Sequence, residues 1–205
     1  MALSTFVKIN SVNNLTDARY CAGMYVDLLG FEISPNAEKS IDPQTFKEIT
    51  GWLSGVEYAA ELENESEEEV LRLLTDYDMQ WVEHKSIDLL VSLREKGFNC
   101  IYKQDLTHVK SVKTELAEDL KSKGIYLHLT SKNKELSERE LELVRQLAGS
   151  CDVLLGSGIS PQNLQETLES ISLKGLALNA GDEIKPGLKD FDELADILES
   201  LEIED

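Results

Sequence analysis

The stretch Leu155–Leu164, with the sequence LGSGISPQNL, is the most informative part of this chain about its fold. It follows a short apolar run and brings glycine and serine to the point where a helical pattern begins. A second turn of this kind, Leu178–Glu183 (LNAGDE), follows one unit later. Glycine allows the backbone to approach an anion, and the N–H groups and dipole of a helix start attract negative charge. The two turns predict a phosphate site formed by Gly156, Ser157, Gly158, Asn179, Ala180 and Gly181. Asp182 argues against this site, because a carboxylate repels a phosphate.

Short apolar runs alternate with amphipathic segments along the rest of the chain, as in a series of βα units around a parallel sheet. The runs predict strands near Thr5–Ile9, Val26–Phe31, Val56–Leu62, Met79–Glu83, Asn99–Gln104, Ile125–Leu129, Asp152–Leu155 and Gly175–Leu178. Helices are predicted near Leu15–Ala22, Pro43–Leu53, Ser66–Tyr77, Ser86–Lys96, Val109–Lys123, Ser137–Ala148, Pro161–Ser172 and Phe191–Leu201. Eight repeats favour an α/β fold of the (β/α)8 TIM barrel type, with residues 1–205 forming one domain that ends in a short acidic tail.

Capping residues support several of these predicted helix starts. Asp42 precedes a proline at the first helical position of one segment, and Ser160 precedes Pro161 in the same way. Ser66 stands before a run of three glutamates, which the dipole of a helix start stabilises. These residues predict the starts of three of the eight helices.

In a barrel of this kind the functional groups lie where the strands end, at the C-terminal mouth. The polar residues expected there are Asn10, Ser11, Glu32, Ser34, Lys39, Glu61, Glu63, Glu83, His84, Gln104, Asp105, His128 and Thr130. This set contains no closely spaced pair of histidines or carboxylates of the kind that binds a metal. We therefore expect neither a metal nor a cofactor.

Composition limits the partners and the compartment. The chain has 39 acidic and 20 basic residues, a formal charge of −19, which disfavours nucleic acid and anionic membrane surfaces. The cysteines, Cys21, Cys100 and Cys151, are widely spaced and form no metal or disulfide motif, so we expect buried thiols in a reducing compartment. The N-terminus shows no basic region followed by an apolar core, and no apolar run approaches membrane-spanning length. We therefore expect a cytoplasmic protein. The sequence does not indicate an oligomeric state.

Several motifs carry a resemblance to a known family. They are Val7–Ala18 (VKINSVNNLTDA), Asp27–Phe31 (DLLGF), Gly156–Leu164 and Gly181–Asp190 (GDEIKPGLKD). In order and spacing they resemble phosphoribosylanthranilate isomerase of tryptophan biosynthesis, over nearly the whole chain. The resemblance implies a barrel and an Amadori rearrangement that uses a general acid and a general base but no metal or organic cofactor.

The residues at the acid and base positions differ from those of the family. The family's base is a cysteine in a Lys-Ile-Cys-Gly motif, and Asn10 takes its place; its acid is an aspartate closing the sixth strand, and Thr130 takes its place. A carboxamide does not titrate near neutral pH, and a hydroxyl is a far weaker acid than a carboxyl group. His128 stands two residues before Thr130, on the same side of the strand, and is a candidate substitute.

Positions that contact the substrate in the family also differ. Its arginine before the second helix aligns with Lys39, which keeps the charge but loses the bidentate fork. Its eighth-strand aspartate aligns with Ala177, and the two serines that follow align with Asn179 and Ala180. Lys39 and His84 remain as candidate substrate contacts.

Three hypotheses follow. The first is a phosphoribosylanthranilate isomerase-like barrel with a degenerate active site, which is not an efficient isomerase but binds a phosphorylated small molecule. The second is an active isomerase of this substrate or a related sugar phosphate, in which His84 or His128 works with Glu83 or Asp105. The third is a non-catalytic interaction module whose acidic surface recruits a basic partner.

Overall fold

Eight parallel strands close into a barrel, which confirms the predicted TIM fold. The structure, a computed structural model, describes residues 2–35, 37–108, 114–133, 135–180, 183–185, 188–189 and 191–203. The barrel strands, each paired with the next and the last with the first, are β2 (Phe6–Asn10), β3 (Leu28–Glu32), β4 (Glu57–Glu61), β5 (Trp81–His84), β6 (Asn99–Asp105), β7 (Ile125–Thr130), β8 (Val153–Leu155) and β9 (Gly175–Asn179). Every strand predicted from the apolar runs is present.

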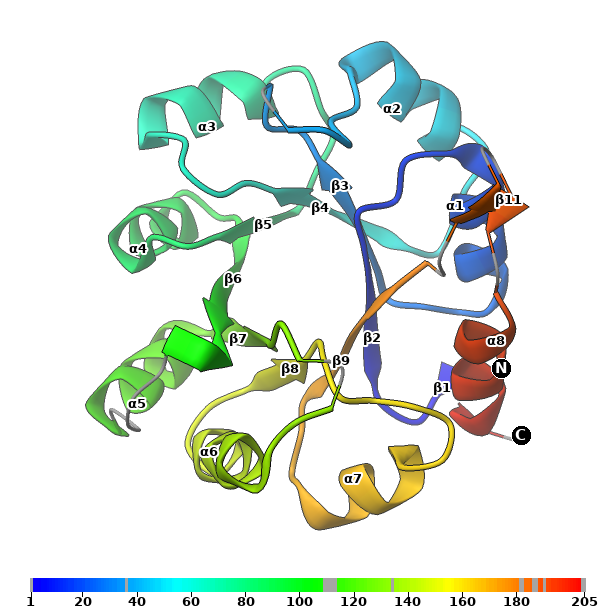
Figure 1. Ribbon diagram of the computed structural model, residues 1–205. Helices are drawn as coiled ribbons and strands as arrows, with labels where there is room; N and C mark the ends of the chain where they lie inside the picture. Colours follow the sequence, from blue (N-terminus) through cyan, green and yellow to red (C-terminus); the bar gives the residue numbers. More distant parts are fainter. Residues whose placement is uncertain are drawn as a thin grey trace.

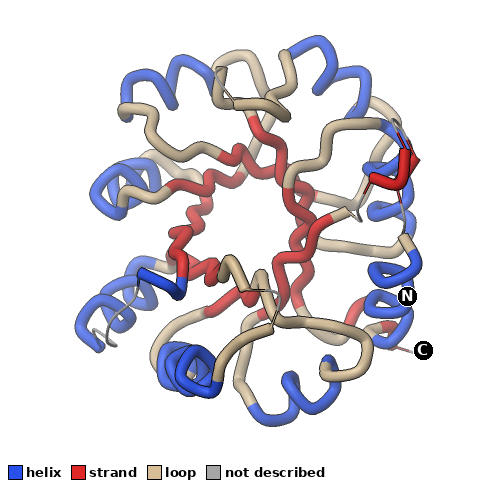
Figure 2. Tube along the Cα trace, in the orientation of Figure 1, coloured by secondary structure: helices blue, strands red, loops and turns tan. Residues whose placement is uncertain are grey.

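Helices surround the barrel, and Figures 1 and 2 show the inner ring of strands inside the outer ring of helices. They are α1 (Leu15–Gly23), α2 (Pro43–Thr50), α3 (Glu67–Leu74), α4 (Ile87–Glu95), α5 (Thr114–Lys123), α6 (Glu138–Ala148), α7 (Leu164–Ser170) and α8 (Asp192–Ser200), with a short 3-10 helix η1 (Leu106–His108) before α5. Each predicted helix is found, although the start predicted at Val109 lies outside the described residues.

The predicted caps are confirmed at two helices and wrong at one. The Asp42 side chain accepts hydrogen bonds at the start of α2, and Ser66 forms a capping box with Glu69 at the start of α3. Ser160 does not cap a helix at Pro161. Residues 161–163 form a turn in which the Ser160 N–H donates to the Asn163 side chain, so α7 begins only at Leu164.

The ends of the chain meet in a small antiparallel pair. Strand β1 (Ala2–Leu3) pairs with β12 (Glu202–Ile203), and the two termini lie side by side in Figure 1. Residues 202–203 of the acidic tail are therefore ordered as a strand, because β1 supplies hydrogen-bond partners for their backbone. A second pair, β10 (Glu183–Lys185) with β11 (Leu188–Lys189), precedes α8.

The outward faces of the strands pack against the helices in one large apolar core, and the inward faces form a second, smaller cluster. In that cluster, Phe6, Trp81 and Tyr126 lie near the beginnings of their strands with ring centroids 5.2–6.0 Å apart. We call these three residues the aromatic plug. The plug closes the N-terminal end of the barrel interior, which leaves the C-terminal end for a site.

The three cysteines are buried and free, as the sequence predicts. Burial raises the pKa of the Cys100 thiol to about 12 and that of Cys151 to about 11, so neither forms a thiolate near neutral pH. Among the described residues, no helix has the length and apolar character needed to cross a membrane.

Candidate functional site

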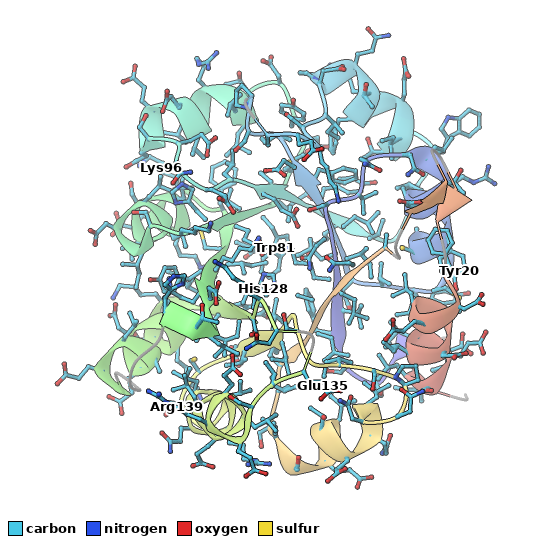
Figure 3. The ribbon with its side chains drawn as sticks, viewed as in Figure 1. Tyr20, Trp81, Lys96, His128, Glu135 and Arg139 are labelled. Atoms are coloured by element: carbon cyan, nitrogen blue, oxygen red, sulfur yellow. The ribbon has the colours of Figure 1, made fainter. Side chains whose placement is uncertain are left out.

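A set of charged side chains fills the barrel interior immediately above the aromatic plug. Lys8, Glu61, Glu83 and His128 stand two residues beyond Phe6, Ala59, Trp81 and Tyr126 on the same strands, and therefore point to the same side. Their side chains are between 0 and 7% exposed. We call these four residues the charged layer. Figure 3 labels Trp81 and His128, and both lie inside the ring of strands.

Lys8 holds one side of the charged layer together. Its Nζ lies 2.5 Å from Glu61 Oε1, 3.1 Å from Glu83 Oε2 and 2.6 Å from the Asn10 amide oxygen. Burial alone would lower the Lys8 pKa, but the Glu61 and Glu83 carboxylates outweigh burial and raise the pKa above its ordinary value. Lys8 is therefore a permanent cation, which excludes it as a neutral amine nucleophile.

Glu83 connects Lys8 to the histidine. Its Oε2 accepts from Lys8 and lies 2.9 Å from His128 Nδ1, while Lys103 Nζ stands 3.4 Å from the other oxygen. Burial would raise the Glu83 pKa, but Lys8, His128 and Lys103 outweigh burial and hold the pKa well below its usual range. An ionised carboxylate only accepts hydrogen bonds, so His128 Nδ1 is the donor in this contact, and His128 Nε2 has no hydrogen-bond partner among the described residues.

Two glycines make room for this layer. A Cβ on Gly30 would lie 2.0 Å from Glu61 Oε1 and 3.0 Å from Lys8 Nζ, and a Cβ on Gly156 would lie 2.3 Å from His128 Nε2. Real Cβ atoms do not approach other atoms this closely, so each glycine makes room for a side chain on an adjacent strand. Gly156 thus has a packing role that its place in the glycine turn did not reveal.

Asn10 and Thr130, at the predicted base and acid positions, are at the mouth and are engaged in fixed hydrogen bonds. The Asn10 amide oxygen accepts from Lys8, and its nitrogen donates to the Ala177 carbonyl at 2.9 Å and to Asn179 Oδ1 at 3.3 Å. Thr130 Oγ1 donates to the Gln104 carbonyl at 3.3 Å. Neither side chain can take up or release a proton near neutral pH.

The residue after Asn10 adopts a strained backbone conformation. Ser11 has φ of 51°, in the left-handed region that serine rarely occupies. Its N–H and its hydroxyl both donate to Glu61 Oε2 at 3.0 Å, which offsets the strain. Glu61 therefore fixes both Lys8 and the turn that follows β2.

Other sequence candidates stand apart from the charged layer. His84 alternates with Glu83 and faces the outer side of β5; its Nδ1 accepts from the Ser86 N–H, and burial lowers its pKa. Asp105 accepts from the hydroxyl and N–H of Thr107, and the hydroxyl most strongly lowers its pKa. Lys39 is exposed in the loop between β3 and α2. Of the histidine and carboxylate pairs considered, the structure brings together only His128 and Glu83.

The glycine turn after β8 is partly available to a ligand. The Gly156 N–H donates to the Leu129 carbonyl at 2.8 Å, and the Ser157 hydroxyl is paired with the backbone of Ser131. In the described part of the chain, the N–H groups of Ser157 and Gly158 have no acceptor. Gly158 adopts φ of 77°, which requires glycine.

In the second turn, Asn179 is exposed at the end of β9 and Ala180 is buried. Gly181 and Asp182 lie outside the described residues, so the predicted anion site is described only in part. Within the described ranges, no group of three or more His, Cys, Asp or Glu side chains could hold a metal ion.

Sequence reasoning missed Lys8 and Lys103 as members of the site. A signal for Lys8 was present, since it stands between Val7 and Ile9 in a parallel strand, where both faces are buried. A lysine there must have buried carboxylate partners. Which carboxylates these are depends on strand pairing across the barrel, and the sequence does not contain that information locally.

Comparison with curated proteins finds relatives along the full length of the chain. It is 25% identical over 197 residues to N-(5'-phosphoribosyl)anthranilate isomerase of Sulfurihydrogenibium sp., covering 92% of this chain and 94% of the relative. It is 26% identical over 205 residues to the enzyme of the same name from Aquifex aeolicus, covering 94% and 96%. A scan against models of known protein families found no match.

Solved structures of the same kind share the fold. The phosphoribosylanthranilate isomerase of Thermotoga maritima superposes with a TM-score of 0.77 at 21% identity, over 96% of this chain and 98% of that one. The enzyme from Thermus thermophilus gives 0.76 at 24% identity, over 96% and 98%. The resemblance that the motifs carry is thus confirmed by relatives of one name along the whole chain.

Proposed function

On the premise that the chain is a divergent member of the phosphoribosylanthranilate isomerase family, we propose that it binds a phosphorylated small molecule at the C-terminal mouth and catalyses the family's isomerisation poorly. Similarity over the whole chain supports a function of the phosphoribosylanthranilate isomerase type. The loss of efficient catalysis is inferred from the residues at the mouth.

The observation that carries this proposal is the state of Asn10. The family's reaction needs a base that removes a proton from the second carbon of the sugar, and the resemblance assigns this role to the position of Asn10. An amide has no basic lone pair at neutral pH, and both ends of this amide are held, by Lys8 and by the Ala177 carbonyl. Thr130 cannot replace a carboxylic acid as the proton donor. Loss of either group costs roughly 10²- to 10⁴-fold in rate.

Phosphate binding rests on the turn after β8. The N–H groups of Ser157 and Gly158 are the donors available there, since that of Gly156 is committed to Leu129. Backbone donors suit an anion in a chain of formal charge −19, because they attract it locally against the field of the surface. Binding would be tested by NMR titration with ribose 5-phosphate and, as the matched control, ribose. Equal responses to the two sugars would contradict a phosphate site.

Restoring the missing acid and base tests the catalytic part. In a fluorescence assay of phosphoribosylanthranilate consumption at high protein concentration, the natural chain is expected to show little turnover. The variant Asn10→Cys/Thr130→Asp should gain at least about a hundredfold. The control Asn10→Ser/Thr130→Ser changes the same positions without adding a titrating group and should gain nothing. Turnover by the natural chain at the level of a genuine isomerase would refute the proposal.

A second candidate function is favoured by one observation, the buried dyad of His128 and Glu83. His128 Nε2 has no hydrogen-bond partner in the described chain and lies at the inner face of the mouth, against Gly156. A histidine oriented by a carboxylate is a common general acid or base in enzymes. In this case any turnover of phosphoribosylanthranilate or a related sugar phosphate would be lost in His128→Gln and kept in His84→Gln, because His84 faces away from the interior.

A further inference from the structure

We propose that the ligand of this mouth carries a protonated amine in addition to its phosphate, and that Glu32 is the residue that selects the amine. This inference rests on the proposed function and deepens it, since it names the chemical class of the ligand as a phosphorylated amine, such as an amino-sugar phosphate. The argument depends on how charge and hydrogen-bonding capacity are distributed around the mouth.

Three carboxylates stand side by side on adjacent strands. Glu32 on β3 is in register with Glu61 on β4, and Glu61 is in register with Glu83 on β5. Each stands an even number of residues after a member of the apolar inner cluster on the same strand, and all three therefore face the interior. Two ammonium groups, those of Lys8 and Lys103, contact this row. Neither of these ammonium groups forms an ion pair with Glu32.

Glu32 is the member of the row whose side chain is unpaired. Glu61 and Glu83 are bound by Lys8, whereas the Glu32 carboxylate forms no hydrogen bond or ion pair with any other described residue. It is partly buried at the end of β3, and burial, then the nearby Glu61 and Glu63, raises its pKa. A cation beside Glu32 would relieve both the desolvation and the repulsion, whereas a carboxylate on the ligand would add to the repulsion.

Two further atoms of the charged layer lack a hydrogen-bond partner. Glu83 Oε1 and His128 Nε2 are buried without a partner in the part of the chain that the structure describes, and both residues are 1% exposed. Lys103 Nζ stands 3.4 Å from Glu83 Oε1 without forming a hydrogen bond. Buried polar atoms are normally paired, so the Glu83 Oε1 acceptor indicates that a donor is supplied from outside the chain. An ammonium group supplies three donors and a positive charge.

The positions of the two ends fit one bifunctional ligand. In the closed order of strands, β3, β4 and β5 lie across the barrel from β7, β8 and β9. The carboxylate row therefore faces the Ser157–Gly158 turn across the mouth. A molecule with phosphate at one end and ammonium at the other can bind both sides, and one that replaces the ammonium with a carboxylate meets repulsion at Glu32.

The test compares glucosamine 6-phosphate with glucose 6-phosphate, which differ only in an amino group in place of a hydroxyl. Dissociation constants would be measured by calorimetry at neutral pH and low salt. The natural chain should bind the amino sugar at least about tenfold more tightly, the value of one charged hydrogen bond. Glu32→Gln should remove the preference. Glu95→Gln, which removes a charge from the exposed end of α4, should keep it.

The other outcomes separate this inference from the proposed function. Absence of a preference for the amino sugar, or a preference that Glu32→Gln leaves intact, overturns the amine inference. If ribose 5-phosphate still binds in that case, the proposed phosphate site stands and only the amine is wrong. If neither ribose 5-phosphate nor either hexose phosphate binds at millimolar concentration, both proposals fail together.

Discussion

At one end of the barrel interior, Phe6, Trp81 and Tyr126 form the aromatic plug. Two residues further along the same strands stand the polar side chains of Lys8, Glu83 and His128. The charged layer is almost fully removed from water, whereas in the plug Trp81 is buried and Phe6 and Tyr126 are partly buried. The plug is stabilised by burial itself, whereas the charged layer must offset the desolvation of every ion through its partners. The charged layer therefore contributes less to stability than an apolar layer of the same size, which suggests that it is kept for function.

The largest expected effect breaks the charged layer at its cation. Lys8→Met removes the cation that the buried carboxylates Glu61 and Glu83 share and should lower the free energy of unfolding by about 3–5 kcal/mol. The measurement is urea denaturation at neutral pH. Lys85→Met is the matched control, because Lys85 pairs with Glu63 on the surface, where both side chains are more than 40% exposed, and should cost less than about 1 kcal/mol. Equal losses of unfolding free energy in the two variants would contradict the expected difference between the buried and the exposed ion pair.

The pH dependence of stability should reveal Glu83. Its pKa in the folded chain is well below the ordinary value of 4.5, so the unfolded chain binds more protons between those two values. The stabilisation is present above the unfolded pKa and is lost as pH falls through the folded pKa. The stability gap between the natural chain and Glu83→Gln should narrow below about pH 5. The gap for Glu95→Gln should not change in this way.

A methyl group added at the edge of the charged layer should have a smaller effect. Gly156→Ala places a Cβ 2.3 Å from His128 Nε2 and forces the ring to move, which should cost about 1–3 kcal/mol in urea denaturation. Gly149→Ala is the control: its φ is −70° and the nearest atom to a new Cβ is 3.5 Å away, so no loss is expected there. A tolerated Gly156→Ala would mean that His128 is not held against Gly156.

The smallest effect is expected in the aromatic plug. Trp81→Phe keeps a ring in place but removes the indole hydrogen bond to Glu57 Oε2, which measures 2.7 Å. Glu57 is exposed and can be solvated, so the loss should be about 1–2 kcal/mol in thermal or urea unfolding. A loss as large as that of Lys8→Met would show that the plug is not the more tolerant layer.

The fold was predictable because its signals are local. The apolar strand at Phe6–Asn10 and the amphipathic helix at Leu15–Gly23 each follow from a short pattern, and a series of such units favours closure. Features set by hydrogen bonds between residues distant in the sequence were harder to predict. The pairing of residues 2–3 with 202–203 joins the two ends of the chain, and no local sequence pattern predicts it.

The sequence by itself determined the barrel, the family resemblance and the absence of a titrating group at Asn10 and Thr130, because each depends on residue identity and order along the chain. Only the tertiary structure decided which charges meet. Lys8 and Glu61 are separated by 53 positions and Glu83 and His128 by 45, and closure of the sheet brings each pair within hydrogen-bonding distance. Closure also gives Glu61 and Glu83 a shared cation, while the Glu32 carboxylate has no partner among the described residues, and the sequence alone does not distinguish these three glutamates.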